Sequence, residues 1–249
     1  MEIIYKDKKT KVYSDNSYDQ LSTYSLQRRC QAYQTDEPET VNWLSSFTDD
    51  AVFFDVGSNV GGYSFMANMA HQSIKIYSFE ANFMNFYTQI KTCKENNITN
   101  VYPINIAINN NNTFNLLKSF TIGNGGDGSF GDELKDEISN SKFSNPFNKG
   151  PKLEVGMLGI TLDSLVYDFK LEIPNYIKID VDGNELLVLK GAQKLLGEQS
   201  LKEIFIEIDD EIYKNNEIEN LIKSYAFTMT KNIDVGTKDK PIRMALFTR

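Results

Sequence analysis

A glycine-rich turn that follows an apolar run constrains the fold of this chain more than any other stretch. The run Ala51-Val-Phe-Phe leads into Asp55-Val-Gly57-Ser58-Asn59-Val-Gly61, and a short apolar run that ends in a turn is typical of a buried parallel strand. Glycine has no Cβ, so it permits positive φ and lets a ligand lie against the main chain. The turn predicts a strand-to-helix connection at the carboxyl edge of a parallel sheet, where open α/β sheets bind ligands.

The segments after the turn alternate between strand and helix at short spacing. This β-α-β-α-β order predicts an α/β fold of the Rossmann-like type, a doubly wound and mostly parallel sheet with right-handed crossovers. We expect strands at 51–54, 74–79, 101–108, 176–181 and 203–208, helices at 63–70, 83–95, 185–196 and 217–225, and a closing hairpin of 227–230 with 244–248.

Two segments fall outside this alternation. An uneven apolar stripe from Asp19 to Phe47, broken near Pro38, predicts two helices. We therefore assign residues 1–50 to an N-terminal helical extension and 51–249 to the main domain. Residues 119–152 are polar, Gly-rich and without periodicity, which is typical of an insert or lid loop.

Charge and composition exclude several classes of function. The net charge of −8 argues against a nucleic-acid partner, because phosphate binding depends on clustered Lys and Arg. No stretch approaches the roughly 20 apolar residues that cross a bilayer, and the N-terminus is charged where a secretory signal is apolar. With only two cysteines, Cys30 and Cys93, we expect a cytoplasmic protein with reduced thiols.

Glu80 lies 19 positions after Gly61 and ends the second predicted strand. An acid at that place can accept hydrogen bonds from the ribose hydroxyls of an adenosine-containing cofactor. A nicotinamide enzyme would prefer G-x-G-x-x-G, whereas this turn has G-x-x-x-G preceded by Asp55, which would repel a pyrophosphate. The turn suits the zwitterionic methionine tail of S-adenosylmethionine better; the alternative is a tight connection that binds no ligand.

Charged residues interrupt two of the later strands. With a period of two, Lys178, Asp180 and Asp182 share one face of their strand, and Glu207 lies on the next one. If these strands are neighbours, Lys178 can pair with Glu207, since an unmatched charge on a central strand is costly. The carboxylates would supply a general base or hold a divalent cation. A purely structural ion pair is the alternative for Lys178, and we assign no metal site.

Other reactive side chains are less informative. His71 falls at the end of a predicted helix, and Cys30 and Cys93 lie in helical patterns without a neighbouring His. We therefore expect neither a thiol nucleophile nor a zinc site.

The chain resembles the FkbM family of S-adenosylmethionine-dependent methyltransferases. The resemblance is carried by Phe54-Asp-Val-Gly-Ser-Asn-Val-Gly-Gly-Tyr-Ser, Ser78-Phe-Glu-Ala-Asn, Ile106-Ala-Ile, Thr161-Leu-Asp-Ser-Leu, Ile177-Lys-Ile-Asp-Val-Asp-Gly-Asn-Glu-Leu-Leu-Val-Leu-Lys-Gly-Ala and Ile206-Glu. The family more often has Glu at the position of Asp182 and Ala at that of Asn184. The extension and the 119–152 segment lie outside the strong match.

The resemblance implies a seven-stranded sheet whose last strand is antiparallel, and S-adenosylmethionine as the cofactor. The turn and its partners would contact that cofactor through Asp55, Gly57, Ser58, Asn59, Gly61, Glu80 and Ala107, and the reaction would involve Asp180, Asp182, Glu207 and Lys178. It favours O-methylation of a sugar, glycan or related small molecule, as in polysaccharide biosynthesis. The alternatives are N- or carboxyl methylation of a peptide or metabolite, and a non-catalytic cofactor-binding protein.

Overall fold

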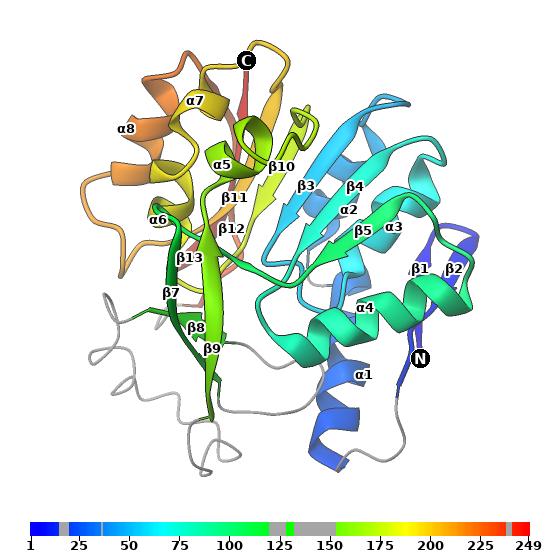
Figure 1. Cartoon of the computed structure of the whole chain (residues 1–249). Helices are drawn as coiled ribbons and strands as arrows, with labels where there is room; N and C mark the ends of the chain where they lie inside the picture. Colours follow the sequence, from blue (N-terminus) through cyan, green and yellow to red (C-terminus); the bar gives the residue numbers. More distant parts are fainter. Residues whose placement is uncertain (15–19, 36, 120–127, 132–152, 238–240) are drawn as a thin grey trace.

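The computed structural model describes residues 1–14, 20–35, 37–119, 128–131, 153–237 and 241–249. A seven-stranded sheet in the order β12-β13-β11-β10-β3-β4-β5 forms its centre (Figure 1). The strand bounds are β3 Val52–Val56, β4 Lys75–Phe79, β5 Val101–Ile104, β10 Tyr176–Ile179, β11 Glu203–Asp209, β12 Thr228–Asp234 and β13 Ile242–Thr248. Strands β11, β10, β3, β4 and β5 pair in parallel, and β13 is antiparallel to both of its neighbours. These pairings confirm the mostly parallel sheet with an antiparallel last strand.

Helices cover both faces of this sheet. The first face carries α1 Gln20–Thr35, α2 Pro38–Ser45, α3 Gly62–Ala70 and α4 Phe83–Glu95, and the second carries α5 Leu162–Tyr167, α6 Glu185–Lys190, α7 Gln193–Leu196 and α8 Glu217–Lys223. The segment expected as one helix at 185–196 is two helices, because Gly191 packs against the chain near Asn109: a Cβ there would lie 2.1 Å from the Asn109 carbonyl oxygen.

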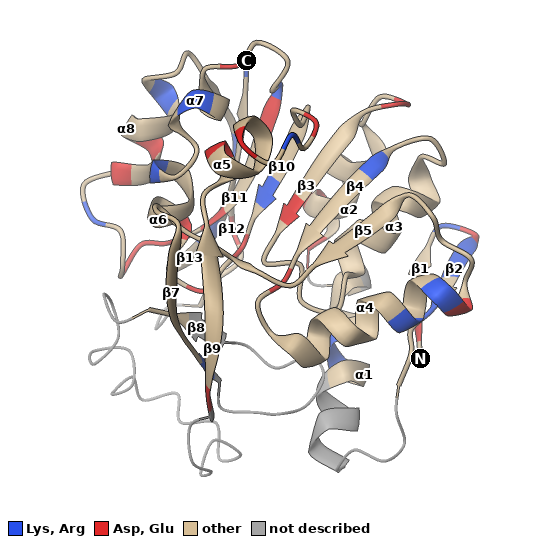
Figure 2. Ribbon diagram, viewed as in Figure 1, with Lys and Arg blue, Asp and Glu red and all other residues tan. Residues whose placement is uncertain are grey.

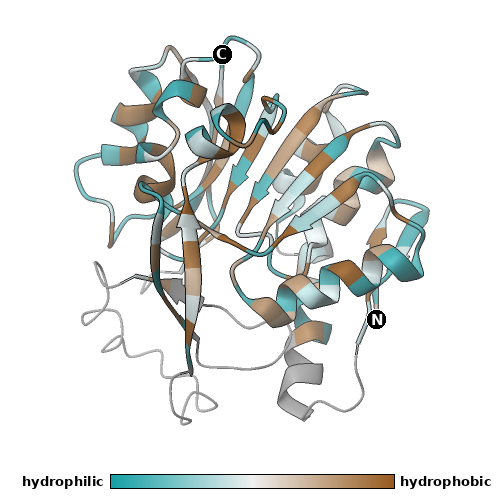
Figure 3. Cartoon of the chain, in the orientation of Figure 1, coloured by the Kyte–Doolittle hydropathy of each residue, from teal (hydrophilic) through white to brown (hydrophobic). Residues whose placement is uncertain are grey.

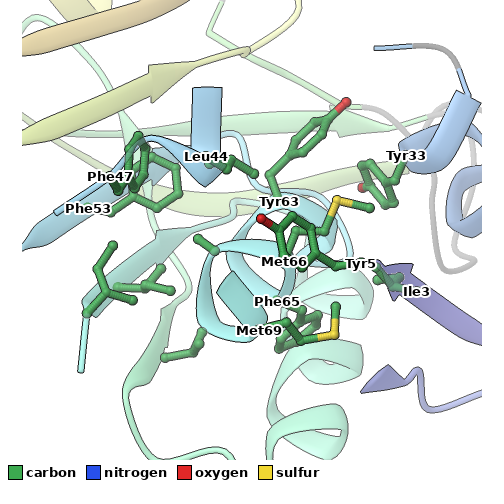
Figure 4. Packing of buried hydrophobic residues seen from close by; sticks show 14 of the residues in the cluster. Ile3, Tyr5, Tyr33, Leu44, Phe47, Phe53, Tyr63, Phe65, Met66 and Met69 are labelled. Carbon is green, nitrogen blue, oxygen red and sulfur yellow. The ribbon is translucent and has the colours of Figure 1, made fainter. Parts of the chain in front are cut away.

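The hydrophobic cores lie between the sheet and the two helix layers, and Figure 3 shows hydrophobic segments along the central strands. Under the first layer, buried aromatic and apolar side chains gather around α3, as Figure 4 shows for Phe53, Phe65 and Met66 among others. Trp43 on α2 packs at 5.0 Å between ring centroids on Phe205 of β11, and its indole Nε1 donates to Glu203 at 2.6 Å. The helices of the extension therefore form part of the main core.

A hairpin of β1 Glu2–Tyr5 and β2 Lys8–Lys11 precedes these helices. Ile3 and Tyr5 are buried in the same core as α3. Residues 1–50 were expected to be helical throughout, so this hairpin differs from the expectation. None of the helices in the described ranges is long and apolar enough to cross a membrane.

A second, four-stranded sheet lies to the lower left of the arrowheads of β3, β4 and β5 in Figure 1, in the order β6-β9-β7-β8. Its strands are β6 Ala107–Ile108, β7 Thr113–Ser119, β8 Gly128–Phe130 and β9 Leu153–Ile160. The single strand expected at 101–108 is therefore wrong. The chain turns at Asn105, whose side-chain amide donates to the carbonyls of Glu80 and Ala81, and Ala107 and Ile108 join this other sheet. Most of the expected 119–152 loop lies outside the described residues.

Candidate functional site

The glycine-rich turn connects β3 to α3 and is shaped by three left-handed residues. Gly57 has φ +80°, Asn59 φ +51° and Gly61 φ +84°. The backbone N–H groups of Gly57 and Ser58 both donate to the carbonyl of Phe79 at the end of β4. A Cβ on Gly57 would lie 1.8 Å from the carbonyl oxygen of Asp180, so only glycine allows the turn to pack this closely against the end of β10.

Glu80 closes the turn from the neighbouring strand. One carboxylate oxygen accepts a hydrogen bond from the N–H of Asn59 and the other accepts one from the N–H of Asn82, both at 2.7 Å. The residue is only 8% exposed. These bonds hold the carboxylate in place beside the turn.

A cleft opens at this carboxyl edge of the central sheet. Of the residues expected to bind a cofactor, Gly57, Asn59, Glu80 and Ala107 line it, and of those expected to take part in the reaction, Asp180 and Asp182 do. Its other lining residues are Val56, Phe79, Ala81, Ile106, Ile108, Leu117, Phe130, Val181 and Asn184. The lining therefore combines polar and apolar groups, which suits a ligand with a flat apolar ring and a polar chain.

The second sheet supplies a wall of this cleft that sequence reasoning missed. Leu117 on β7 and Phe130 on β8 line the cleft and form a small buried cluster with Ala107 and Met157. The side-chain amide of Asn184 donates to the carbonyl of Phe130 at 3.3 Å, which connects this wall to the end of β10. The apolar runs in 113–119 and 153–160 were the only available signal.

Asp55, Ser58 and Gly61 do not line the cleft, although all three lie in the turn. Asp55 is buried, and its carboxylate accepts a 2.6 Å hydrogen bond from the hydroxyl of Ser64 on α3. Burial raises the pKa of this carboxyl, against the opposing charge of Lys178. The Ser58 hydroxyl accepts from the side-chain amide of Gln89 on α4. The Asp55 and Ser58 side chains therefore support the turn through contacts with α3 and α4.

Charged residues lie within β3 and β10, as the red and blue bands near their arrowheads show in Figure 2. Lys178 is 1% exposed and pairs with Asp180 at 2.7 Å. The expected ion pair between Lys178 and Glu207 is wrong. Although β10 and β11 are neighbours, Lys178 is in register with Phe205 of β11. Asp180, two residues after Lys178, lies on the same face and pairs with it instead. Burial disfavours the charged ammonium, but the charges of Asp180, Glu37 and Asp55 outweigh this and raise the pKa of Lys178.

Glu207 is partly buried on β11 and lies outside the lining of the cleft. Its pKa is raised well above the usual range, first by burial and then by the charges of Asp180 and Asp182, while Lys178 acts in the opposite direction. The charges of Asp180 and Asp182 therefore act on Glu207. Asp182 is exposed and has a left-handed backbone, with φ +53°.

Glu185 is a site residue that sequence reasoning overlooked. Its buried carboxylate accepts from the N–H groups of Val181 and Gly183, both at 3.1 Å, and from the hydroxyl of Tyr213 at 2.9 Å. It therefore holds the loop that carries Asp182. The glutamate that follows Asp-Gly-Asn in the sequence was the available signal.

The extension also reaches the site. The ring of Tyr63 on α3 lies 4.7 Å from the ammonium of Lys178, and Tyr33 on α1 packs edge-on against Tyr63 at 4.9 Å. Burial raises the pKa of Tyr63, followed by the charge of Glu37, which precedes α2. Tyr33 and Glu37 carry no sequence signal for this role, because only the packing of α1 and α2 brings them here.

The remaining reactive side chains, His71, Cys30 and Cys93, do not line the cleft. His71 contacts Asp49 at 3.2 Å and the carbonyl of Leu44. Burial raises the pKa of Cys30 to about 11 and that of Cys93 to about 12, so both thiols stay protonated. Within the described ranges, no group of three His, Cys, Asp or Glu residues is placed to hold a metal ion.

Asp163 has a structural role outside the cleft, and this role accounts for the Thr161-Leu-Asp-Ser-Leu motif. Its carboxylate accepts from the N–H groups of Lys194 and Leu195 at the start of α7, both at 2.9 Å, and its own N–H donates to the carbonyl of Gly191. The hydroxyl of Thr161 caps α5 through the N–H of Ser164. The Thr161-Leu-Asp-Ser-Leu motif thus joins α5 to α7.

Comparison with known proteins agrees with this geometry. The family model for the methyltransferase FkbM domain matches residues 55–229, which include the turn, Glu80 and the carboxylates. A search of curated proteins finds no sequence match.

Solved structures with a similar fold include a SAM-dependent methyltransferase from Aquifex aeolicus, with a TM-score of 0.50, 11% identity and coverage of 94% of this chain and 100% of that one. Magnesium protoporphyrin IX methyltransferase from Synechocystis, solved with bound SAM, has a TM-score of 0.49 at 12% identity, over 95% and 87% of the two chains. The m1A22 tRNA methyltransferase TrmK from B. subtilis has a TM-score of 0.48 at 8% identity, over 86% and 65%. At these identities the likeness concerns the fold alone and leaves the acceptor open.

Proposed function

The chain belongs to the FkbM family of methyltransferases, with S-adenosylmethionine as its cofactor, and from this premise we propose that it methylates a hydroxyl oxygen of a sugar, glycan or related small molecule. The observation that carries the proposal is the set of carboxylates beside the cleft. Asp180 and Asp182 line the cleft, and their charges help to raise the pKa of Glu207. A hydroxyl acceptor needs such a base, because its proton must leave as the new bond forms.

The residues of the cleft fit the cofactor. Glu80 lines the cleft and its carboxylate would accept from the ribose hydroxyls, while Phe79, Ala107 and Phe130 would offer apolar surface to the adenine. The turn at Gly57 and Asn59 would hold the methionine moiety. When bound, S-adenosylmethionine supplies an electrophilic methyl group on a sulfonium, so that positioning of the acceptor provides much of the acceleration.

In this proposal Glu207 is the general base and Asp180, fixed by Lys178, orients the acceptor. Bound S-adenosylmethionine would supply the methyl group to the acceptor oxygen, and the proton of that hydroxyl would pass to the Glu207 carboxylate. The products are a methyl ether and S-adenosylhomocysteine. A carboxyl group whose pKa is raised toward the working pH is suited to this task.

The test is methyl transfer from labelled S-adenosylmethionine to a panel of hydroxylated acceptors, with Asp180→Asn as the variant. We expect a methyl ether that resists alkaline hydrolysis, and for the variant a large loss of turnover with S-adenosylhomocysteine binding retained. A base-labile ester or a methylamine would identify carboxyl or N-methylation instead. Normal cofactor binding without transfer to any hydroxylated acceptor would refute the proposal.

We also propose which class of acceptor the chain uses and where it acts. The net charge of −8 favours a small or glycan acceptor over a nucleic acid, because a nucleic-acid site needs clustered cations. A place in polysaccharide biosynthesis in the cytoplasm is consistent with a sugar acceptor. Transfer to tRNA or rRNA in the same labelled assay would contradict the first of these.

A further inference from the structure

The buried ammonium of Lys178 is contacted from its own strand and from helix α3. On β10 it pairs with the Asp180 carboxylate at 2.7 Å, and the centroid of the Tyr63 ring on α3 lies 4.7 Å from it. Burial opposes the charged form, but the charges of Asp180, Glu37 and Asp55 raise the pKa of Lys178, so the side chain stays an ammonium. The face of an aromatic ring attracts a cation, and most strongly where water is excluded.

The direction of the Asp180 side chain depends on this ammonium. The backbone of Asp180 is fixed, because its N–H donates to the carbonyl of Val56 at 3.0 Å and its own carbonyl packs against Gly57. Its side chain is 26% exposed and lines the cofactor cleft. Rotation about the side-chain bonds would change where the carboxylate points. The ion pair with Lys178 therefore limits its direction in the cleft.

Tyr63 is held more firmly than the lysine that it contacts. It is buried in the first turn of α3, the helix that follows the glycine-rich turn. Tyr33 on α1 packs edge-on against it at 4.9 Å between ring centroids (Figure 4). Tyr33 also packs on the backbone of Gly62, where a Cβ would lie 2.1 Å from its ring. An aromatic ring turns about fewer side-chain bonds than a lysine, so the ring determines where the ammonium lies.

We infer that Tyr63 is a positioning residue for methyl transfer, whose ring holds the Lys178 ammonium in place so that the ammonium directs the Asp180 carboxylate at the acceptor. This inference rests on the role proposed above for Asp180. Tyr63 does not line the cleft, so it acts through Lys178 and not by contact with the cofactor. The aromatic face performs this task, and the phenolic hydroxyl is not needed for it.

Steady-state kinetics of Tyr63→Leu and Tyr63→Phe test the inference. Leucine removes the aromatic face, whereas phenylalanine keeps it and removes only the hydroxyl. We expect kcat to fall at least about tenfold in Tyr63→Leu, since small errors in the position of a reacting group are costly. In Tyr63→Phe, kcat should stay within about twofold of the natural value. The Kd for S-adenosylhomocysteine should be unchanged in both variants. Tyr63→Met replaces Tyr63→Leu if the latter does not fold, because methionine adapts to irregular space.

The matched control is Phe47→Leu. Phe47 is buried in the same core as Tyr63, with exposed fractions of 5% and 6%, and its ring stacks on Tyr176 instead of a cation. Phe47→Leu should lower the Tm but leave kcat close to the natural value. A loss of packing alone would affect both leucine variants alike, so the comparison separates positioning from stability.

Two further measurements follow the path through Lys178. If Tyr63 acts on Asp180, Tyr63→Leu should lower kcat by less than about twofold in an Asp180→Asn background, because the two changes are not additive. A crystal structure needs no activity. It should show the Asp180 carboxylate displaced from Lys178 in Tyr63→Leu and kept in place in Tyr63→Phe.

The inference is overturned by equal kcat values in Tyr63→Leu and Phe47→Leu, by equal losses in Tyr63→Leu and Tyr63→Phe, by a full additional loss in the Asp180→Asn background, or by an unmoved ion pair in Tyr63→Leu. The proposed function fails separately. If the product is a methylamine or an ester, O-methylation is wrong, and the same variants compared on that acceptor decide the role of Tyr63. If a methyl ether forms and Tyr63→Leu keeps the natural kcat, O-methylation stands and the inference is wrong.

Discussion

Replacing Glu185 tests whether one buried carboxylate holds the loop that carries the reacting groups. Glu185 is 2% exposed and accepts three hydrogen bonds, from Val181, Gly183 and Tyr213. Asp182, which lies between the two backbone donors, has φ +53°, and Gly183 has φ +94°. A left-handed Asp is unfavourable by itself and persists because its surroundings require it.

The magnitude follows from the bonds that each variant loses. Glu185→Ala leaves two backbone N–H groups and one hydroxyl without this acceptor, and each buried donor costs about 1–3 kcal/mol. Since water can reach part of the vacated space, we expect the free energy of unfolding to fall by about 3–5 kcal/mol. Glu185→Gln keeps an oxygen for the two N–H groups and should lose only about 1 kcal/mol. Tyr213→Phe removes one bond to a charged group and should lose about 2 kcal/mol.

The pH dependence gives an independent check. Burial raises the pKa of Glu185 even though its hydrogen bonds act in the opposite direction. A carboxyl with a raised folded-state pKa contributes stability that is fully present below the unfolded pKa and is lost as the pH rises through the folded value. Glutamine does not titrate. The stability of the natural protein relative to Glu185→Gln should therefore increase as the pH falls from 7 toward the ordinary glutamate pKa of about 4.3.

Urea unfolding at several pH values and calorimetry with S-adenosylhomocysteine measure these effects. Glu185→Ala should weaken cofactor binding and lower kcat, because Asp182 and Asn184 line the cleft, whereas Glu185→Gln should retain most of both. Equal losses in the two variants, or an unchanged loop and activity in Glu185→Ala, would refute the reasoning.

Three further predictions concern the cofactor cleft and the base. Glu80→Gln should weaken S-adenosylhomocysteine binding by about 10–100-fold in calorimetry, since bonds to a charged acceptor contribute about 1.5–3 kcal/mol; an unchanged Kd would contradict the ribose role. Gly57→Ala should lower the free energy of unfolding by more than about 2 kcal/mol, because its Cβ would lie 1.8 Å from the Asp180 carbonyl at φ +80°. The control is Gly197→Ala, because Gly197 has a negative φ and a Cβ there would have its nearest contact at 3.2 Å. Equal Tm shifts for Gly57→Ala and Gly197→Ala would contradict this prediction. The raised pKa of Glu207 predicts that kcat/KM for a hydroxyl acceptor increases with pH across the neutral and alkaline range; Glu207→Gln should remove this dependence, and a pH profile identical to that of the natural protein would exclude Glu207 as the base.

Much of the central architecture was predictable from short stretches of sequence. The turn at Gly57 and the alternation of apolar runs with amphipathic segments predicted the parallel sheet, and the structure places Glu80 beside that turn with its carboxylate on Asn59. These features depend on residues within a few positions of one another, because side-chain period and turn conformation are local properties. The grouping of Asp180, Asp182 and Glu207 followed from the same reasoning, since the carboxyl ends of parallel strands meet at one edge.

Contacts between distant segments could not be predicted in the same way. Lys178 pairs with Asp180 on its own strand instead of Glu207, because the register between β10 and β11 sets Phe205 beside it. The chain leaves the central sheet after Ile104 and builds a second sheet whose Leu117 and Phe130 wall the cleft.

The amino-acid order thus determined which segments become strands and helices and which side chains can carry charge at the sheet edge. Tertiary packing decided which of those side chains meet: Tyr33 packs on Tyr63, and the charge of Glu37 acts on Lys178, only because α1 and α2 pack on α3 and β11. The physical reason is that backbone preference is set by each residue and its near neighbours, whereas the partner of a buried charge is set by whichever group the whole core brings within a few ångströms.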